Sequence, residues 1–579
     1  MVQGAVGRLP CQHQCHTYTR QGAARGQPIL SIDHSIIKNF LEWPIVSLLP
    51  SFLQFLEGLA EVRLVMSPNN QGMFPIRAAL SYQHRYHYES YSMAGNRSHR
   101  CRRVSIHVLD DDSLLHIFRL YRPAILDEDE TDDSRILRGG EWSRERWWYN
   151  LVHVCRRWRS IILASPSHLG LCLVCTCRTP VATMLLHSPP LPIVIDHIIK
   201  DHEVTPADED RILLALQQRH RVRRIRLLMP IQSLQKLTTA MDKEFPMLEY
   251  LYMSPPTKED TSSTLPGTFR APRLRHLLLR SFAISMTFPS LTTSVGLITL
   301  SLEEISTSAY FRPNDLLERL SCMPQLETLG ISFHSPIPSN DAGKKLLKAP
   351  ITTSVSLPNL RWFGFGGNSA YLEALLPHLS TPRLEKLQIW FFIQFNFSVP
   401  HLLQSMGATP NVRFSSANLM FHEKYVSLTA YPREGAKMYA FYLEVCTRYF
   451  DLQVESAAKI FSGLKTTFSA VEHLSLEYER DSVSSDWGDE ADDAHWRELL
   501  GSFSNVKTLL VPSGLVGELS SSLPSDGGES PLELLPKLKE LRYSTRCEDS
   551  DPFSKFISDR QNAGSPVTLT KQKIRPDRR

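Results

Sequence analysis

The chain has 579 residues, of which 42% are hydrophobic, and its 64 Lys and Arg against 60 Asp and Glu give a formal net charge of +4. This composition supports a substantial core and excludes a chain that is disordered throughout, and the near-neutral charge argues against a dedicated nucleic-acid binder. Ten scattered cysteines predict a reducing compartment, the cytoplasm or the nucleus. The length predicts several domains, or one domain with an extended repeat array.

Residues 1–103 give little functional signal, and we interpret them as poorly ordered or unassigned. Residues 1–30 are polar, without the apolar stretch of a signal peptide. The longest uncharged run, Trp43 to Leu56, has fourteen residues, short of the roughly 20 that cross a bilayer. The Cys and His residues between positions 11 and 16 are too closely spaced for a usual zinc site. We therefore expect no membrane span, no metal and no cofactor.

Two stretches between residues 109 and 171 predict short amphipathic helices. Asp110–Tyr121 begins with acidic residues, which favour a helix N-terminus, and one face carries Leu114, Leu115, Phe118 and Tyr121. Residues 151–165 predict a single helix that Pro166 stops, and one side of it carries Leu151, Val154, Cys155, Trp158, Ile161 and Ile162. Helices this short do not bury their apolar side chains alone, so they need a partner or a larger domain.

These residues resemble the F-box family. The resemblance is carried by Ile117-Phe118, by Val154-Cys155-Arg156-Arg157-Trp158-Arg159, by Ile161-Ile162 and by His168-Leu169. Asp110 stands where the family has a proline, and residues 123–146 form an acidic insertion. The resemblance implies a small helical domain over residues 104–200 that docks a Skp-type adaptor.

Carried over residue by residue, the resemblance implies an apolar surface of ten residues, some facing the adaptor and some the domain's own core. They are Leu109, Leu114, Leu115, Ile117, Phe118, Val154, Cys155, Trp158, Ile161 and Ile162. Trp158 is the strongest single candidate, because large aromatic residues dominate interface energies. The alternative is that all ten pack only within one globular domain.

Three local patterns follow the motif. Cys172, Cys175 and Cys177 lie in an apolar run, which favours buried thiols in a strand over a metal site. Residues 193–195 predict a short strand. Thr205 then predicts a helix N-cap, with Pro206 at the first helical position and Asp208 placed for a capping box, and the helix is expected to end near residue 220.

Residues 201–545 repeat an apolar residue at i, i+3 and i+5, the spacing of a leucine-rich-repeat strand. The copies begin at Val222, Leu248, Leu274, Leu297, Leu326, Leu360, Leu384, Val471, Val506 and Leu538. Six have a proline two places ahead: Pro246, Pro272, Pro324, Pro358, Pro382 and Pro536. The predicted fold class is α/β: a small helical F-box-like domain followed by an irregular leucine-rich-repeat solenoid, in which each strand buries its alternate side chains against the next coil.

Two segments depart from the repeat. Residues 418–468 predict a longer excursion that contains a helix over Ala436–Thr447. Residues 546–579 predict a C-terminal cap, with Lys571–Arg579 as a disordered basic tail.

An F-box-like domain followed by leucine-rich repeats is the arrangement of substrate receptors in SCF-type cullin-RING ubiquitin ligases. The resemblance therefore implies a subunit of the ubiquitin conjugation pathway that binds a Skp-type adaptor, and through it a cullin-RING ligase, and holds a protein substrate on its repeats. The side chains between the buried strand positions are the candidate substrate contacts: Tyr250, Tyr252, Trp362, Lys386, Gln388, Trp390, Glu477 and Arg542.

Other classes of function have weaker support. The sequence contains no P-loop, zinc-protease or nucleophile-elbow motif, so we expect no catalytic residue and no enzyme. One alternative is a leucine-rich-repeat interaction scaffold with no ubiquitin-ligase role. The other is nucleic-acid binding by the arginines at 219, 221, 223, 224 and 226, which we interpret instead as the solvated face of the first repeat.

Overall fold

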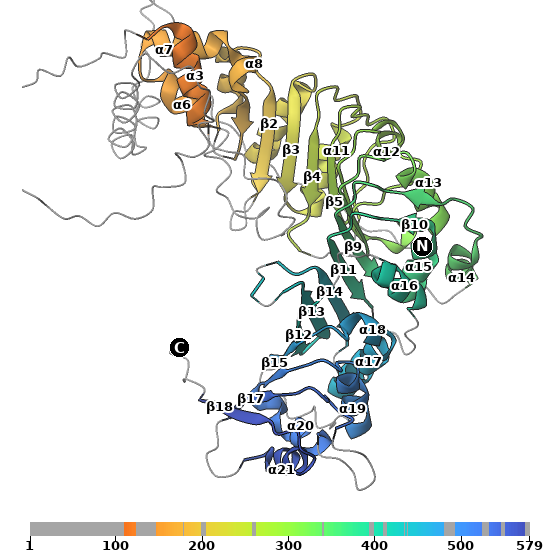
Figure 1. Ribbon diagram of the computed structural model, residues 1–579. Coiled ribbons are helices and arrows are strands. Elements are labelled where there is room, and N and C mark those ends of the chain that lie inside the picture. Colours follow the sequence, from red (N-terminus) through yellow and green to blue (C-terminus); the bar gives the residue numbers. More distant parts are fainter. Residues whose placement is uncertain are drawn as a thin grey trace, which may run out of the picture. The chain divides into compact units, whose positions relative to one another are not determined.

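We describe the fold from a computed structural model (Figure 1). The residues described are 109–122, 146–177, 179–198, 204–257, 262–337, 341–392, 399–408, 414–433, 435–436, 438–447, 449–479, 492–523, 532–545 and 551–573. The chain divides into two compact units, residues 1–110 and 111–579, and all described residues except 109 and 110 belong to the second. The predictions for residues 1–103, including the Cys and His residues at 11–16, and most of the acidic insertion lie outside the described residues.

A sixteen-stranded sheet is the main element of the described part of the second unit. Its strands are β1 (Leu173–Cys175), β2 (Ile193–Ile198), β3 (Val222–Leu228), β4 (Tyr250–Ser254), β5 (His276–Arg280), β6 (Thr299–Ile305), β7 (Thr328–Phe333), β9 (Trp362–Gly367), β11 (Lys386–Phe391), β12 (Ser416–His422), β13 (Tyr425–Tyr431), β14 (Phe441–Cys446), β15 (His473–Glu479), β16 (Thr508–Val511), β17 (Glu540–Thr545) and β18 (Thr568–Lys573). A separate two-stranded sheet pairs β8 (Val355–Ser356) with β10 (Leu379–Ser380). The fold is therefore mixed α/β with a long, mostly parallel sheet.

The helices fall in two groups. Near the start of the unit lie α3 (Asp111–Tyr121), α6 (Trp147–Val152), α7 (Arg156–Ala164) and α8 (Pro166–Leu169). The helices between the strands are α9 (Val181–His187), α10 (Pro206–Gln217), α11 (Ile231–Thr239), α12 (Pro289–Thr293), α13 (Pro313–Leu320), α14 (Asp341–Lys348), α15 (Ser369–Leu375), α16 (Pro400–Ala408), α17 (Phe450–Gly463), α18 (Lys465–Phe468), α19 (Asp493–Gly501), α20 (Val516–Ser522) and α21 (Ser554–Asn562).

The order of the strands in the sheet follows the chain except at one place. Between β11 and β15 the order is β14, β13, β12, and the two antiparallel pairs of the sheet, β12–β13 and β13–β14, lie there. Elsewhere each strand is parallel to its neighbours, so each needs a return connection, which a helix commonly supplies. Figure 1 shows α11, α13, α15, α16, α17 and α19 along one face of the strands. We call the opposite face the open face.

The ten strands predicted from the repeat are confirmed, because the i+3 and i+5 residues of every copy lie in a strand of the large sheet. Equivalent residues lie side by side: Leu251 pairs with Ile225 on one side and with Leu277 on the other. All three are fully buried. The alternation of one buried and one half-exposed residue along β11 continues this pattern, and it places the apolar side chains under the helices.

The helix predicted after Thr205 is also confirmed. Helix α10 begins at Pro206, and the Thr205 side chain and the Asp208 side chain each accept a hydrogen bond from the other residue's backbone N–H. The strand predicted at residues 193–195 lies in β2. The first predicted helix is observed as α3, and Leu114 and Phe118 are fully buried.

The single helix predicted over residues 151–165 is wrong. Helix α6 ends at Val152, and α7 begins at Arg156. Cys155 has an extended backbone (φ −157°, ψ 170°) and is the N-cap of α7, where its Sγ accepts a hydrogen bond from the Trp158 N–H at 3.5 Å. The break moves Val154 off the apolar face and leaves it 52% exposed.

Two predictions near the C-terminal half are wrong as well. Residues 441–446 form strand β14 instead of part of a helix, because Phe441, Leu443 and Val445 are buried while the residues between them are not, a period of two that suits a strand. The tail predicted from Lys571 is in part a strand, since Lys571–Lys573 belong to β18, which pairs with β17. Among the described helices, none has the length and apolarity to cross a membrane.

Candidate functional site

The helices α3, α6, α7 and α8 form a small cluster that we call the helical bundle. The Phe118 ring meets the Trp158 ring edge-on, with 4.8 Å between ring centroids. At the N-terminus of α3, Asp111 Oδ1 lies 2.7 Å from Arg157 Nη2. Trp158 is 4% exposed, so it belongs to the core of the bundle rather than to its surface.

The ten candidate adaptor residues have different exposures. The buried ones are Leu114, Phe118, Trp158, Ile161 and Ile162. The partly exposed ones are Leu109, Leu115, Ile117 and Cys155, of which Leu109 belongs to the first unit. Val154 is exposed, and so is Leu120, at 59%. Leu120 was missed from the sequence, because the apolar period of α3 selects the buried face.

The bundle contacts the first strand of the sheet. Arg146 Nη2 donates hydrogen bonds to the Val174 carbonyl at 3.3 Å and to Thr176 Oγ1 at 3.2 Å. Burial in the same region raises the pKa of Tyr149 to about 12 and that of Cys175 to about 11, so both groups stay protonated near neutral pH. The prediction of buried thiols in a strand is confirmed for Cys175 in β1, while Cys172 is buried just before the strand and Cys177 is half-buried after it.

Four candidate substrate residues come together on the open face, where they join three residues that the sequence did not single out. We call this set the aromatic patch: Trp362, Lys386, Gln388, Trp390, Tyr439, Tyr442 and Glu444. The Trp362 indole N–H donates to Gln388 Oε1 at 2.7 Å, and Gln388 Nε2 donates to the Tyr439 hydroxyl. Lys386 Nζ lies 4.1 Å from the centroid of the Tyr439 ring. The patch is thus a connected set of aromatic and polar side chains.

The far side of the aromatic patch ends in a carboxylate. The Trp390 and Tyr442 ring centroids are 6.1 Å apart, and the Tyr442 hydroxyl donates to Glu444 Oε2 at 2.6 Å. Burial, and then the charge of Glu444, raise the pKa of Tyr442 well above its usual value. The hydroxyl therefore remains a donor to Glu444 at physiological pH. The alternation of buried and partly exposed residues along β14 is the sequence signal that could have placed Tyr442 and Glu444 on the open face, and the helix prediction overlooked it.

The other candidate substrate residues lie apart from the aromatic patch along the sheet. On β4, the Tyr250 ring centroid is 5.6 Å from that of His276 and 5.9 Å from the Arg224 guanidinium carbon, and Tyr252 is half-buried. On β17, Arg542 Nε lies 2.8 Å from Glu540 Oε1. On β15, Glu477 is exposed.

The arginines proposed as a nucleic-acid site have partners within the fold. Arg221 donates to the carbonyls of Leu191 and Pro189 at 3.0 and 3.2 Å. Arg223 forms an ion pair with Glu249 at 2.8 Å, and a buried pair joins Arg226 Nη1 to Asp196 Oδ2 at 3.3 Å. These contacts give the three arginines structural roles between neighbouring strands.

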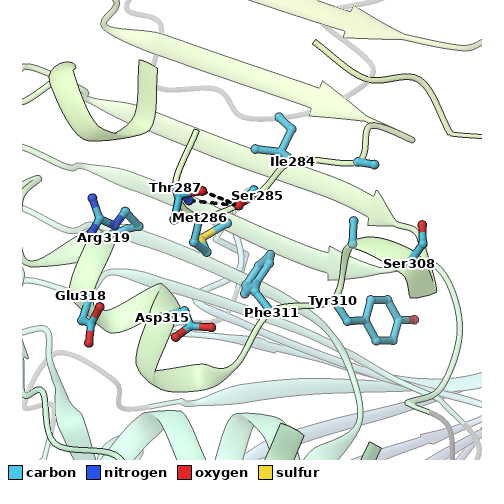
Figure 2. A pocket seen from close by; sticks show the side chains of 12 residues that line it. Ile284, Ser285, Met286, Thr287, Ser308, Tyr310, Phe311, Asp315, Glu318 and Arg319 are labelled. Atoms are coloured by element: carbon cyan, nitrogen blue, oxygen red, sulfur yellow. Dashed lines mark hydrogen bonds between the residues drawn. The ribbon is translucent and has the colours of Figure 1, made fainter. Parts of the chain in front are cut away.

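A pocket of about 490 Å³ lies beyond the ends of β5 and β6, beside α13 (Figure 2). Met286 and Phe311 lie next to each other in it, and Asp315, Glu318 and Arg319 come from α13. Ser285 Oγ is hydrogen-bonded to Thr287 Oγ1 at 2.8 Å. The described lining contains no histidine or cysteine. Across the described ranges, no cluster of His, Cys, Asp and Glu is placed to hold a metal ion.

Neither protein-family models nor curated proteins match this chain. The helical bundle and the aromatic patch are the two candidate interaction sites of the chain.

Proposed function

We propose that this chain is the substrate-recognition subunit of an SCF-type cullin-RING ubiquitin ligase, with its F-box-like helices on a Skp-type adaptor and its repeats on a protein substrate. The main support is the order of the parts. A helical bundle with exposed apolar residues precedes a sheet in which ten strands share one apolar spacing and pair in register. In this proposal the strands and their return helices form a leucine-rich-repeat solenoid, and the protein transfers nothing itself.

The exposures divide the ten candidate adaptor residues into two roles. Phe118 of α3 and Trp158 of α7 hold the bundle together, because both rings are buried and in contact, and Ile161 is also buried. The adaptor then contacts the apolar side chains that remain outside, chiefly Val154 and Leu120, flanked by Ile117. An exposed leucine or valine gains about 1.5 to 3 kcal/mol when a partner covers it fully, so a few such residues suffice for an anchor.

The test is capture of a purified Skp-type adaptor by the full chain. A Leu120→Glu, Val154→Glu double variant should lose at least about thirtyfold in affinity, the scale of a hot-spot loss, and circular dichroism should show an unchanged fold. The matched control is Leu186→Glu, Val295→Glu, which changes a leucine and a valine that are 79% and 63% exposed elsewhere. Equal capture by both double variants would contradict the proposed surface.

One observation favours the alternative, an interaction scaffold with no ubiquitin-ligase role. Arg146, at the start of α6, is bonded to the carbonyl of Val174 in β1, which suits a bundle that caps the sheet. Failure of the natural chain to capture any Skp-type adaptor, with its bundle folded, would favour the scaffold.

A further inference from the structure

The open face between β11 and β15 is built from aligned residues. One row runs across the strands as Trp390, Glu444, Ser427, Met420 and Glu477, each opposite the next. The neighbouring row has Gln388, Tyr442, Thr429, Asn418 and Ser475. The first row thus runs from an aromatic ring on β11 to a carboxylate on β15, and the second row has polar side chains at both ends.

Three carboxylates lie on this face, one on β14 and two on β15. Glu444 accepts the Tyr442 hydroxyl, while Glu477 and Glu479 are exposed and form no ion pair with the rest of the described chain. Burial, with Glu444 and Glu479, raises the pKa of Tyr425, and burial with Glu477 raises that of Tyr431. Glu444 of the aromatic patch and the two exposed carboxylates of β15 therefore lie on the same face as the Lys386 ammonium, which is over the Tyr439 ring.

One neutral acceptor of the same face lacks a donor within the described part of the chain. Asn418 Oδ1 is buried and accepts no hydrogen bond from the described residues. A buried acceptor without a donor costs about 1 to 3 kcal/mol, so an N–H donor that displaces the covering side chains and reaches this oxygen would relieve that cost. An arginine side chain supplies five N–H donors, binds carboxylates in a bidentate manner and stacks on aromatic rings. These are the functional groups that the aromatic patch and its carboxylates accept.

We propose that the open face from β11 to β15, centred on Trp390, Glu444 and Glu477, binds an arginine-rich segment of a partner protein. Only the identification of this partner as the ubiquitination substrate rests on the proposed function. The binding of an arginine-rich segment applies equally to a scaffold. Global charge does not explain such binding, because the formal net charge of the chain is +4, so attraction for a cationic peptide has to come from the local carboxylates.

The experiment is fluorescence anisotropy of a short fluorescein-labelled oligo-arginine peptide titrated with the full chain, beside oligo-lysine and oligo-glutamate peptides of the same length. The Glu477→Gln, Glu479→Gln variant should bind oligo-arginine about tenfold more weakly, since two exposed carboxylates are removed. The Trp390→Leu variant should bind it about threefold more weakly, since a ring face is lost. The matched control, Asp242→Asn, Glu498→Gln, changes two exposed carboxylates elsewhere and should bind like the natural chain.

Each remaining outcome would overturn part or all of the assignment. No binding of oligo-arginine, or equal binding by the natural chain and the Glu477, Glu479 variant, would reject the site. Preference for oligo-glutamate would show that the site does not attract cationic peptides. Equal affinity for oligo-lysine would show that it does not recognise arginine specifically. The Glu477, Glu479 variant should capture the Skp-type adaptor as the natural chain does, so that loss of peptide binding and loss of adaptor binding are separate results.

Discussion

At the scale of single residues, His197 makes the stability of the chain sensitive to pH. The imidazole is 4% exposed, and burial lowers its pKa to about 4 from an ordinary 6.5, although Asp208 raises it. The folded state therefore holds the neutral ring, and its advantage is present above pH 6.5 and is lost as the pH falls towards 4. We expect the free energy of unfolding to fall by about 2 kcal/mol between pH 7 and pH 5.

Urea titrations at the two pH values measure this loss. The His197→Leu variant removes the titrating group while keeping an apolar side chain in β2, so its unfolding free energy should change less between pH 7 and pH 5. An equal change in the variant and the natural chain would show that other groups cause the acid sensitivity.

Substitution by alanine should lower the stability of the bundle strongly at Trp158 and very little at Leu120. Trp158→Ala leaves a cavity beside the Phe118 ring and should cost about 3 to 5 kcal/mol, which would unfold the bundle. Leu120→Ala removes an exposed side chain and should change stability by less than about 0.5 kcal/mol. Limited proteolysis measures the difference, with cleavage within residues 109–170 as the readout. Resistance of the Trp158→Ala variant would show that the ring is not part of the core.

At the scale of elements, glycines in β7 and β9 shape the open face. A Cβ atom at Gly364 would overlap the Trp362 ring, and one at Gly330 would lie 2.8 Å from Ser301 Oγ. Gly364→Ala should therefore displace Trp362, break its hydrogen bond to Gln388 and cost about 1 to 3 kcal/mol. Tryptophan fluorescence and thermal unfolding report the two effects. Gly296→Ala is the control, because a Cβ there meets nothing within 4 Å, and similar results for both variants would contradict the prediction.

At the scale of the whole molecule, the C-terminal coil should protect the end of the sheet. Arg560 in α21 is fully buried and donates to the carbonyls of Pro536 and Leu538 at 3.3 and 3.4 Å. Strand β18 pairs along β17, with Leu569 opposite Leu541. A chain that ends at residue 550 exposes β17 and should lose about 2 kcal/mol for each large apolar side chain uncovered, and it should associate through the open edge.

Size-exclusion chromatography and thermal unfolding measure these effects. The control is a chain that ends at residue 573, which keeps both α21 and β18. An unchanged elution volume and melting temperature for the shorter chain would show that the last coil does not protect the sheet.

The sequence by itself determined the repeated strands. The i, i+3, i+5 spacing located ten of them, and the register confirms that equivalent residues such as Ile225 and Leu251 lie side by side. Each strand buries the same alternate positions against its neighbour, so every copy needs apolar residues at the same spacing, and a short stretch of sequence shows that spacing. The N-cap of α10 could also be predicted from a short stretch of sequence, because the side chains of Thr205 and Asp208 accept hydrogen bonds from each other's backbone N–H within one turn.

Only the tertiary structure decided which side chains are exposed and which meet across strands. Trp158 fits either an interface or a core by its sequence, and its contact with Phe118, forty residues earlier, placed it in the core. Residues 441–446 pair with β11 on one side and with β13 on the other, and these pairings agree with the period of two along the segment. That strand brings Tyr442 and Glu444 beside Trp390. The aromatic patch forms because strands from distant segments of the chain pair with one another, and no local sequence pattern predicts those pairings.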